Sequence, residues 1–223
     1  MSPASNQTAC RRVILASASP RRREILQAAG FEFEIVPTAV REEQLPGESP
    51  EQFVCRMATE KAEAALEQIA RPGTAPIRAP ILGADTVVVL GGETLGKPVS
   101  AEDARRMLRL LSGQWHRVLT GVCLLAPPQS WPSPRSELRR EIQVASTNVR
   151  FSALTEEEIE EYLASGEAFD KAGGYAIQGL ASKYVEEIQG CYFNVVGLPI
   201  SLLYQMLQRL HSGKSMEPAQ NQR

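Results

Sequence analysis

Histidine and cysteine are scarce in this chain, and the few that it has lie far apart. The four cysteines are Cys10, Cys55, Cys123 and Cys191. They form no CxxC pair, which argues against a zinc site, and they are too sparse for a small disulfide-stapled scaffold. We therefore expect reduced, mostly buried thiols in a cytoplasmic protein. The two histidines, His116 and His211, are too scattered for a metal triad, so we expect His116 to be structural or at the surface.

An excess of positive charge is also missing. The formal net charge is -2, and Lys and Arg are spread along the chain, which argues against a nucleic-acid-binding protein. The sequence contains no GxxxxGK[ST] string, which excludes a P-loop NTPase. Residues 1–12 have no apolar core of signal-peptide length, and no stretch is long and apolar enough to cross a bilayer. We expect neither nucleic acid nor a membrane among the partners.

The chain does contain a regular alternation of strand and helix patterns, and 43% of its 223 residues are hydrophobic. Strands are predicted near residues 13–16, 33–36, 81–90, 117–126, 141–151 and 184–188. Helices are predicted near residues 21–29, 50–69, 100–111, 156–164 and 199–210. This alternation predicts α/β architecture. We expect a single domain over residues 12–211 between disordered tails at 1–11 and 212–223, with a flexible surface loop at 127–137.

The first candidate for a binding site is the string Ser17-Ala18-Ser19-Pro20-Arg21-Arg22, between a predicted strand and a predicted helix. We expect Ser19 to be the N-cap and Pro20 to lie in the first helical turn. Backbone N–H groups at a helix N-terminus carry partial positive charge, and added hydroxyls and guanidiniums would make a phosphate site there. The alternative is an ordinary capped helix with solvated arginines.

The second candidate is Asp85, which interrupts a strongly apolar strand pattern. Because a carboxylate in such a run is costly unless it is paired or binds a metal, we expect it at an exposed end or bulge of the strand. The alternative is an aspartate that turns a strand corner. Glu42 and Glu43 lie in a charged loop, and either could be the second carboxylate that a divalent metal would need beside Asp85.

Three further positions are weaker candidates. Lys97, in Gly96-Lys97-Pro98, could neutralise a phosphate, although an exposed lysine before proline is common. Lys61, late on the helix predicted from residue 50, could equally be a solvated side chain. The loop from 170 to 179 is rich in glycine, and its Gln178 could read the edge of a base through its amide. The alternative for this loop is a plain surface connection.

These pieces, in this order, resemble the Maf family of nucleotide pyrophosphatases. The matching stretches are Leu15-Ala16-Ser17-Ala18-Ser19-Pro20-Arg21-Arg22, Gly83-Ala84-Asp85-Thr86, Gly96-Lys97-Pro98, Leu111-Ser112-Gly113, Thr120-Gly121-Val122, Asp170-Lys171-Ala172-Gly173, Ile177-Gln178-Gly179 and Asn194-Val195-Val196-Gly197-Leu198-Pro199. Each stretch is weak alone. Eight in family order make a chance resemblance implausible.

The resemblance implies an α/β fold like that of the inosine-triphosphate pyrophosphatases: an elongated mixed sheet with flanking helices and two lobes around a cleft. It implies cleavage of nucleoside triphosphates to monophosphate and pyrophosphate with a divalent cation, Mg²⁺ or Mn²⁺, and it implies a homodimer. The late loop matches the branch that acts on dTTP, UTP and modified pyrimidine triphosphates such as 5-methyl-UTP, a house-cleaning role. One departure is Ala176, where that branch often has glycine.

The resemblance also implies roles for individual residues. Asp85 becomes the proton acceptor or water-activating carboxylate. The substrate-specificity positions become Arg21, Thr86 and Gln178. The phosphate contacts become Ser17, Arg22, Lys61 and Lys97. Glu42 becomes the partner of Asp85 in holding the metal, with Glu43 as its rival. The alternative function is a nucleotide-binding regulator of cell division or septum formation that does not hydrolyse its ligand.

Overall fold

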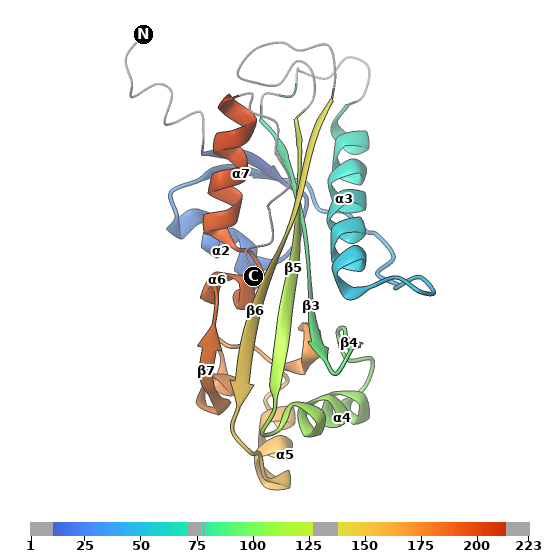
Figure 1. Cartoon of the computed structure of the whole chain (residues 1–223), viewed down its shortest axis with the longest axis vertical. Helices are drawn as coiled ribbons and strands as arrows, with labels where there is room; N and C mark the ends of the chain where they lie inside the picture. The colour runs from blue at the N-terminus through green and yellow to red at the C-terminus, as the bar shows by residue number, and fades with distance from the viewer. Residues whose placement is uncertain (1–10, 71–76, 78, 127–137, 213–223) are drawn as a thin grey trace, which may run out of the picture.

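One mixed sheet of seven strands runs along the length of the elongated molecule (Figure 1). The computed structural model describes residues 11–70, 77, 79–126 and 138–212, so almost all of the two predicted tails and the loop predicted at 127–137 lie outside the described residues. The strands are β1 (Arg12–Leu15), β2 (Glu32–Ile35), β3 (Ile81–Leu90), β4 (Glu93–Leu95), β5 (Trp115–Ala126), β6 (Arg139–Phe151) and β7 (Val185–Gln189).

The strand order is β2-β1-β3-β5-β6-β7, with β4 paired to one end of β3. β1 lies parallel to both β2 and β3, whereas the other pairs are antiparallel. The β3–β4 hairpin turns at Gly91 and Gly92, both with positive φ, as the Gly-Gly pair predicts. The parallel part of the sheet is therefore confined to the β2-β1-β3 edge.

Helices cover both faces of the sheet and form two lobes along it. The helices are α2 (Pro20–Ala28), α3 (Pro50–Ile69), α4 (Ala101–Leu111), α5 (Glu156–Ala164), α6 (Tyr192–Val196) and α7 (Ile200–Ser212), with 3-10 turns η1 (Ala172–Gly174) and η2 (Leu180–Tyr184). In Figure 1, α2, α3, α6 and α7 surround one half of the sheet, and α4 and α5 lie at the other end. The expected class, an elongated mixed α/β fold with flanking helices, is confirmed.

Helix α3 packs unusually close to β3 and β5, because two glycines face it. A Cβ on Gly83 would lie 1.9 Å from the Ala58 carbonyl oxygen, and a Cβ on Gly121 would lie 2.2 Å from that of Val54. The apolar positions of the predicted helix face the sheet and are buried: Phe53, Val54, Met57, Ala58, Ala62 and Ala65. Each large apolar side chain buried in this way stabilises the fold by about 1.5–3 kcal/mol. The glycines thus set how near α3 lies to the strands.

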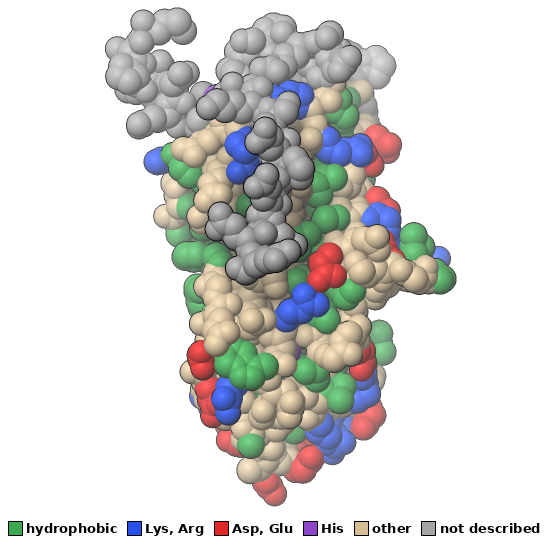
Figure 2. All heavy atoms as spheres, in the orientation of Figure 1, with side chains coloured by type: hydrophobic (Ala, Val, Ile, Leu, Met, Phe, Trp, Pro, Cys, Tyr) green, Lys and Arg blue, Asp and Glu red, His purple; other side chains and the backbone are tan. Residues whose placement is uncertain are grey.

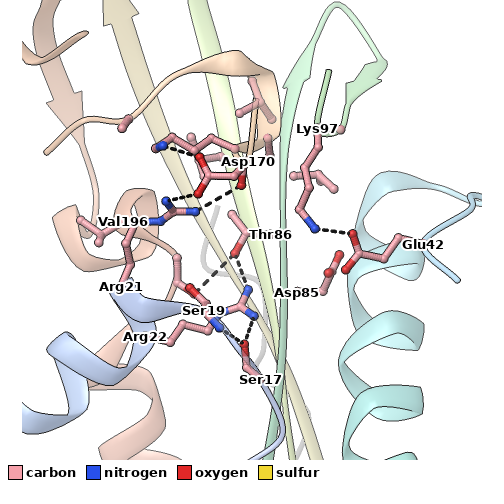
Figure 3. A pocket seen from close by; sticks show the side chains of 18 of the residues that line it. Ser17, Ser19, Arg21, Arg22, Glu42, Asp85, Thr86, Lys97, Asp170 and Val196 are labelled. Carbon is pink, nitrogen blue, oxygen red and sulfur yellow. Dashed lines mark hydrogen bonds and ion pairs between the residues drawn. The ribbon is translucent and has the colours of Figure 1, made fainter. Parts of the chain in front are cut away.

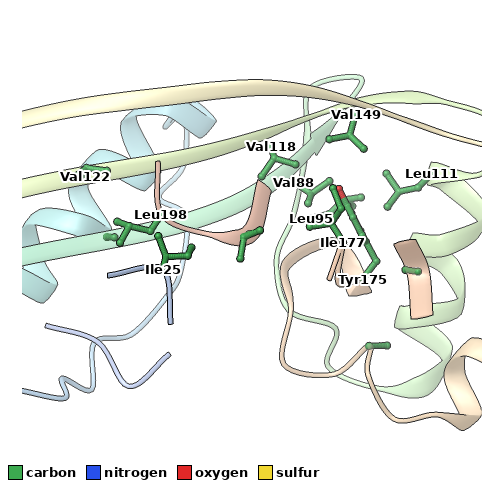
Figure 4. Packing of buried hydrophobic residues seen from close by; sticks show 14 of the residues in the cluster. Ile25, Val88, Leu95, Leu111, Val118, Val122, Val149, Tyr175, Ile177 and Leu198 are labelled. Atoms are coloured by element: carbon green, nitrogen blue, oxygen red, sulfur yellow. The ribbon is translucent and has the colours of Figure 1, made fainter. Parts of the chain in front are cut away.

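A continuous apolar cluster on the opposite face joins the two lobes (Figure 4). It extends from Ile25 in α2 and Leu198, just before α7, to Leu111 and Tyr175 at the α4 end. The ring of Tyr175 packs edge-on against Phe151, with ring centroids 4.7 Å apart. Because this cluster spans the sheet from end to end, it fixes the position of one lobe relative to the other.

His116 belongs to the core, which confirms the structural interpretation. It is buried, its Nε2 lies 2.8 Å from the Tyr175 hydroxyl, and burial lowers its pKa to about 4. Cys123 is also buried, whereas Cys55 and Cys191 are partly exposed; all three are free thiols. Within the described residues, no helix combines the length and the apolar content needed to cross a bilayer.

The lobe that carries α4 and α5 has a surface of mixed charge. Figure 2 shows acidic and basic side chains interspersed at this end of the molecule. Two ion pairs connect the helices: Arg105 of α4 binds Glu160 of α5, and Arg109 binds Glu156 at 2.6 Å. Such exposed pairs stabilise a fold only slightly, because water screens the attraction between the charges. The apolar cluster, and not these pairs, holds α4 and α5 to the sheet.

Candidate active site

The site lies where β3 has no neighbouring strand on one edge. Beyond Leu82 the pairing with β1 ends, and pairing with β4 begins only at Val88. Among the described strands, none pairs with the β3 residues between Leu82 and Val88 on this edge. β1 runs parallel to β3, so the loop after its carboxyl end lies beside this open edge. This is the place where α/β sheets bind ligands.

Asp85 and Thr86 lie at the centre of the open edge, and their side chains point to opposite faces of the sheet (Figure 3). Asp85 pairs regularly with Gly121 of β5 and is 6% exposed. The expectation that Asp85 sits at an exposed end or bulge is therefore wrong. It lies in the middle of β3, and a buried cation rather than solvent compensates for its charge.

That cation is Lys61. Its Nζ lies 2.6 Å from Asp85 Oδ1 and 2.6 Å from Glu42 Oε1, so one ammonium bridges the two carboxylates. Lys61 is 7% exposed, which rules out the alternative of a solvated side chain. The close approach of α3 to β3 at Gly83 brings this helix, and with it Lys61, to the strand that carries Asp85.

The two carboxylates differ in how easily they lose their protons. Burial raises the pKa of Asp85, and the positive charges of Lys61 and Arg22 oppose that shift. Burial also acts to raise the pKa of Glu42, but Lys61 and Lys97 outweigh it and hold this pKa at about 2. Asp85 is thus the stronger proton acceptor of the pair, and Glu42 stays ionised at any physiological pH.

The neighbouring glutamates of the charged loop lie apart. Glu42 lines the cleft and receives Lys97 Nζ at 2.7 Å on its second oxygen. Glu43 pairs instead with Arg41 at 2.6 Å, and both of those side chains are well exposed. Of the two rivals, Glu42 is the one that faces Asp85 across Lys61.

On the other side of Asp85, the loop Ser17–Ser19 and the start of α2 form a turn rich in donors. Pro20 opens the helix as expected, but the Ser19 side chain makes no capping hydrogen bond. The side-chain hydrogen bond at this turn comes from Ser17 instead, whose Oγ accepts from the Ser19 backbone N–H at 3.2 Å. The expected N-cap position is therefore confirmed, while the side-chain cap is not. The Ser19 hydroxyl also lines the cleft.

Arg22 is buried behind this turn, and three partners hold its guanidinium. It donates to Ser17 Oγ at 3.2 Å, to Thr86 Oγ1 at 3.3 Å and to the Gly197 carbonyl at 2.9 Å. Burial lowers its pKa, and the negative charges of Asp85 and Glu42 oppose this shift. The alternative of solvated arginines is wrong for Arg22, whose charge is fixed beside the cleft.

The late loop closes the cleft from the other lobe. Arg21 donates to the Asp170 carboxylate at 3.2 Å and to its carbonyl at 3.4 Å, which connects α2 to this loop. Gln178 is exposed and lines the cleft, so the loop is more than a plain surface connection. The Ala176 N–H donates to the buried Tyr162 hydroxyl at 3.1 Å, which anchors the loop beside Gln178.

All nine residues singled out in the sequence line one cleft with a volume of about 740 Å³. They are Ser17, Arg21, Arg22, Glu42, Lys61, Asp85, Thr86, Lys97 and Gln178. A cleft of this size is in the range of small-molecule sites. Sequence reasoning missed two buried polar residues behind the cleft, Thr120 and Asn194. Both fall in stretches that match the family, but nothing in the local pattern indicated that Thr120 contacts Thr86 and Asn194.

The residues present suit a divalent cation. Glu42 and Asp85 are hard oxygen donors that converge on a single cationic atom, Lys61 Nζ. In the part of the chain that the structure describes, no group of three His, Cys, Asp or Glu side chains could hold a metal alone. Mg²⁺ is commonly bound by one or two carboxylates together with substrate phosphates, and this donor set fits that mode.

An open strand edge with a helix N-terminus, several cations and a carboxylate pair is typical of an α/β protein that binds a phosphorylated ligand. A family model described as "Maf-like protein" matches residues 12–210. The chain belongs to the Maf family, as the resemblance predicts.

Several relatives cover most of the chain. A dTTP/UTP pyrophosphatase of Syntrophomonas wolfei is 47% identical over 195 residues, which span 87% of this chain and 95% of that protein. A dTTP/UTP pyrophosphatase of Anaeromyxobacter dehalogenans is 47% identical over 199 residues, 89% of this chain and 93% of that protein. Among solved structures, the Staphylococcus aureus Ham1 protein aligns over 88% of this chain and 98% of its own, with 13% identity and a TM-score of 0.44.

Proposed function

We propose that this protein hydrolyses UTP and dTTP to the nucleoside monophosphate and pyrophosphate. One observation carries the proposal: the buried Asp85 faces a cleft lined by several cationic side chains. These are Arg21, Arg22, Lys61, Lys97 and Lys171. A triphosphate carries about four negative charges, and fixed cations stabilise the further charge that develops on the leaving pyrophosphate. The names of the two relatives support the choice of substrate.

Asp85 is the proposed proton acceptor. Its carboxylate lies on the open edge of β3, with Oδ1 2.6 Å from Lys61 Nζ; burial raises its pKa, which makes it a better proton acceptor, and the charge of Lys61 opposes that rise. In this role it orients a water molecule and takes its proton as the water oxygen attacks the α-phosphorus. The bond from that phosphorus to the bridging oxygen breaks, and pyrophosphate leaves with the bonding electrons.

The remaining residues bind and orient the substrate in this proposal. The phosphate contacts are Ser17, Arg22, Lys61 and Lys97, and the specificity positions are Arg21, Thr86 and Gln178. Glu42 and Asp85 would hold a divalent cation, Mg²⁺ or Mn²⁺, which when bound neutralises phosphate charge. The support for these roles is that the side chains line one cleft and that their charges are complementary to a nucleotide.

Three finer points stay predictions; the first two rest on the resemblance, and the third on the sparse, unpaired cysteines. Modified pyrimidine triphosphates such as 5-methyl-UTP would be substrates, in a house-cleaning role. The protein would form a homodimer. It would act in the cytoplasm.

A panel of triphosphates tests the proposal. Purified protein is incubated with Mg²⁺ or Mn²⁺ and each of UTP, dTTP, 5-methyl-UTP, CTP, ATP and GTP, and kcat/KM for pyrophosphate release is measured. We expect UTP and dTTP to be preferred over the purine nucleotides. Binding of these nucleotides without any turnover would instead favour the non-hydrolysing regulator. Equal turnover of all six would contradict the assignment of Arg21, Thr86 and Gln178 to specificity.

A further inference from the structure

A buried hydroxyl lies directly behind Thr86, and the proposed function gives it no task. Thr120 of β5 is opposite Thr86 in the register of the sheet and is fully buried. The two Oγ1 atoms are 2.9 Å apart. Thr120 Oγ1 also lies 3.3 Å from the backbone carbonyl oxygen of Asn194, in α6. The Thr120 hydroxyl thus connects the cleft residue Thr86 to a fixed carbonyl in the core.

The numbers of protons and lone pairs indicate which of the two hydroxyls, Thr86 or Thr120, donates to the other. Each hydroxyl has one proton to donate and two lone pairs that accept. The Asn194 carbonyl can only accept, so Thr120 donates to it and receives the proton of Thr86 at 2.9 Å. In the opposite arrangement, Thr86 would donate to the Gly197 carbonyl at 3.5 Å or into the cleft, and the Asn194 carbonyl would lose its bond from Thr120. Each of these carbonyls also accepts one other bond, Gly197 from Arg22 at 2.9 Å and Asn194 from the Gly197 N–H at 3.1 Å. The first arrangement is favoured because its second bond is shorter, 3.3 Å against 3.5 Å, and because it leaves neither proton without a partner inside the protein.

This direction determines what Thr86 offers to a ligand. Its proton is turned inward to Thr120, and one of its lone pairs accepts from Arg22 Nη2 at 3.3 Å. One lone pair is left, and Thr86 lines the cleft and is partly exposed. Thr86 therefore presents an acceptor and not a donor to whatever contacts it from the cleft.

We propose that Thr120 is a positioning residue that makes Thr86 a hydrogen-bond acceptor toward the cleft, so that the site selects pyrimidines with an N3–H donor. The inference rests on the proposed function, and it deepens it by naming the group that is read. Uracil, thymine and 5-methyluracil all carry N3–H. Cytosine has a bare acceptor nitrogen at the same position, which would face the Thr86 lone pair. A site built to pair a donor discriminates against analogues that lack it.

The first test separates Thr120 from a merely structural residue. Thr120→Val keeps the shape and removes the hydroxyl, whereas Thr120→Ser keeps the hydroxyl. We measure kcat/KM for UTP and CTP with each. Thr120→Val should lower the UTP/CTP ratio by about tenfold, the value of one hydrogen bond, and Thr120→Ser should retain the wild-type ratio. An unchanged ratio in Thr120→Val, or an equal loss on both substrates, would overturn the proposal.

A matched control comes from the next strand. Thr147 of β6 is also buried, and its hydroxyl also binds this segment: it donates to the Cys191 carbonyl at 3.2 Å and accepts from Asn194 Nδ2 at 3.0 Å. It makes no bond to Thr86, so Thr147→Val should keep the wild-type ratio. In a double-mutant cycle, Thr120→Val should add no loss of selectivity to Thr86→Val. Additive losses would contradict an action through Thr86.

A substrate analogue tests the same point in the wild-type protein, where no substitution can disturb folding. In 3-deaza-UTP the N3–H is replaced by C–H. Its kcat/KM should be about tenfold below that of UTP, and equal values would overturn the reading of N3–H. If the wild-type protein hydrolyses none of these nucleotides, the proposed function itself fails, which is a different outcome from a change in ratio.

Discussion

At the scale of the residue, the central feature is a buried carboxylate paired with a buried lysine. Asp85 and Lys61 are both nearly buried, and each has lost most of its solvation. Breaking such a pair by removing one charge leaves the other uncompensated, which is strongly destabilising in general. Here Glu42 is a second partner for Lys61 at 2.6 Å, so the lysine keeps a counter-charge if Asp85 is neutralised.

Asp85→Asn should therefore remove activity without unfolding the protein. The amide keeps the shape of the side chain but cannot accept a proton from water, so kcat should fall by about 10²–10⁴. Pyrophosphate release measures the rate, and circular dichroism with thermal melting measures the fold. Glu43→Gln, at an exposed glutamate paired with Arg41, is the control and should leave both unchanged. Near-normal turnover in Asp85→Asn would remove Asp85 from the chemistry.

Glu42 should contribute stability that depends on pH. Its pKa in the fold is about 2, below the ordinary value of 4.5, so its stabilisation is present above pH 4.5 and is lost as the pH falls toward 2. Glu42→Gln should lower the melting temperature at pH 7, and the difference from wild type should narrow below pH 4.5. Thermal melts between pH 7 and pH 3 measure this. A difference that stays constant with pH would show that Glu42 gains nothing from Lys61 and Lys97.

Some of the site could be read from single residues, and some could not. Ser17 and Arg22 lie at a strand-to-helix turn, and Asp85 interrupts an apolar run, which are local signals. The burial of Lys61 had a signal as well, because it falls four residues after Met57 and four before Ala65 on the apolar face of its helix. The task of Thr120 had none, because its partners are 34 and 74 residues away.

At the scale of the element, the packing of α3 against the sheet positions Lys61. Close approach depends on the absence of a side chain at Gly83, where an added Cβ would lie 1.9 Å from the Ala58 carbonyl oxygen. Backbone atoms cannot give way as a flexible side chain can. The whole helix would have to move outward, and Lys61 with it.

Gly83→Ala should therefore destabilise the protein, by at least the roughly 1–3 kcal/mol that overpacking of a core costs. Chemical denaturation measures the free energy of unfolding. Gly96→Ala is the matched control, because nothing lies within 4 Å of a Cβ there and its φ is not positive, so its stability should stay close to wild type. Equal stabilities of the two variants would contradict the account of how α3 packs.

Long elements with a clear pattern were predictable, and short ones were not. The bounds predicted for β3, 81–90, are those observed, because Pro80 and Gly91 delimit a run that is polar only at Asp85 and Thr86. β4 and α6 were not predicted, since they have only three and five residues. Their existence depends on pairing with β3 and on packing against β5, which a local pattern does not contain.

At the scale of the whole molecule, the site is a product of topology. Its residues range from Ser17 to Gln178, and they meet because β1 stops short of the middle of β3 while β4 begins only beyond it. Alternating strands and helices predict the α/β class, but they do not state the order of the strands. The expectation of a cleft between two lobes came from the family resemblance, because members of one family share the order of their strands.

The products of UTP hydrolysis test the central claim most directly. Phosphorus NMR of a reaction with UTP and Mg²⁺ distinguishes cleavage between the α- and β-phosphates from cleavage between the β- and γ-phosphates. We predict uridine monophosphate and pyrophosphate in equal amounts from the wild-type protein, and neither at a comparable rate from Asp85→Asn. The formation of uridine diphosphate and orthophosphate, or the absence of any turnover, would contradict this account.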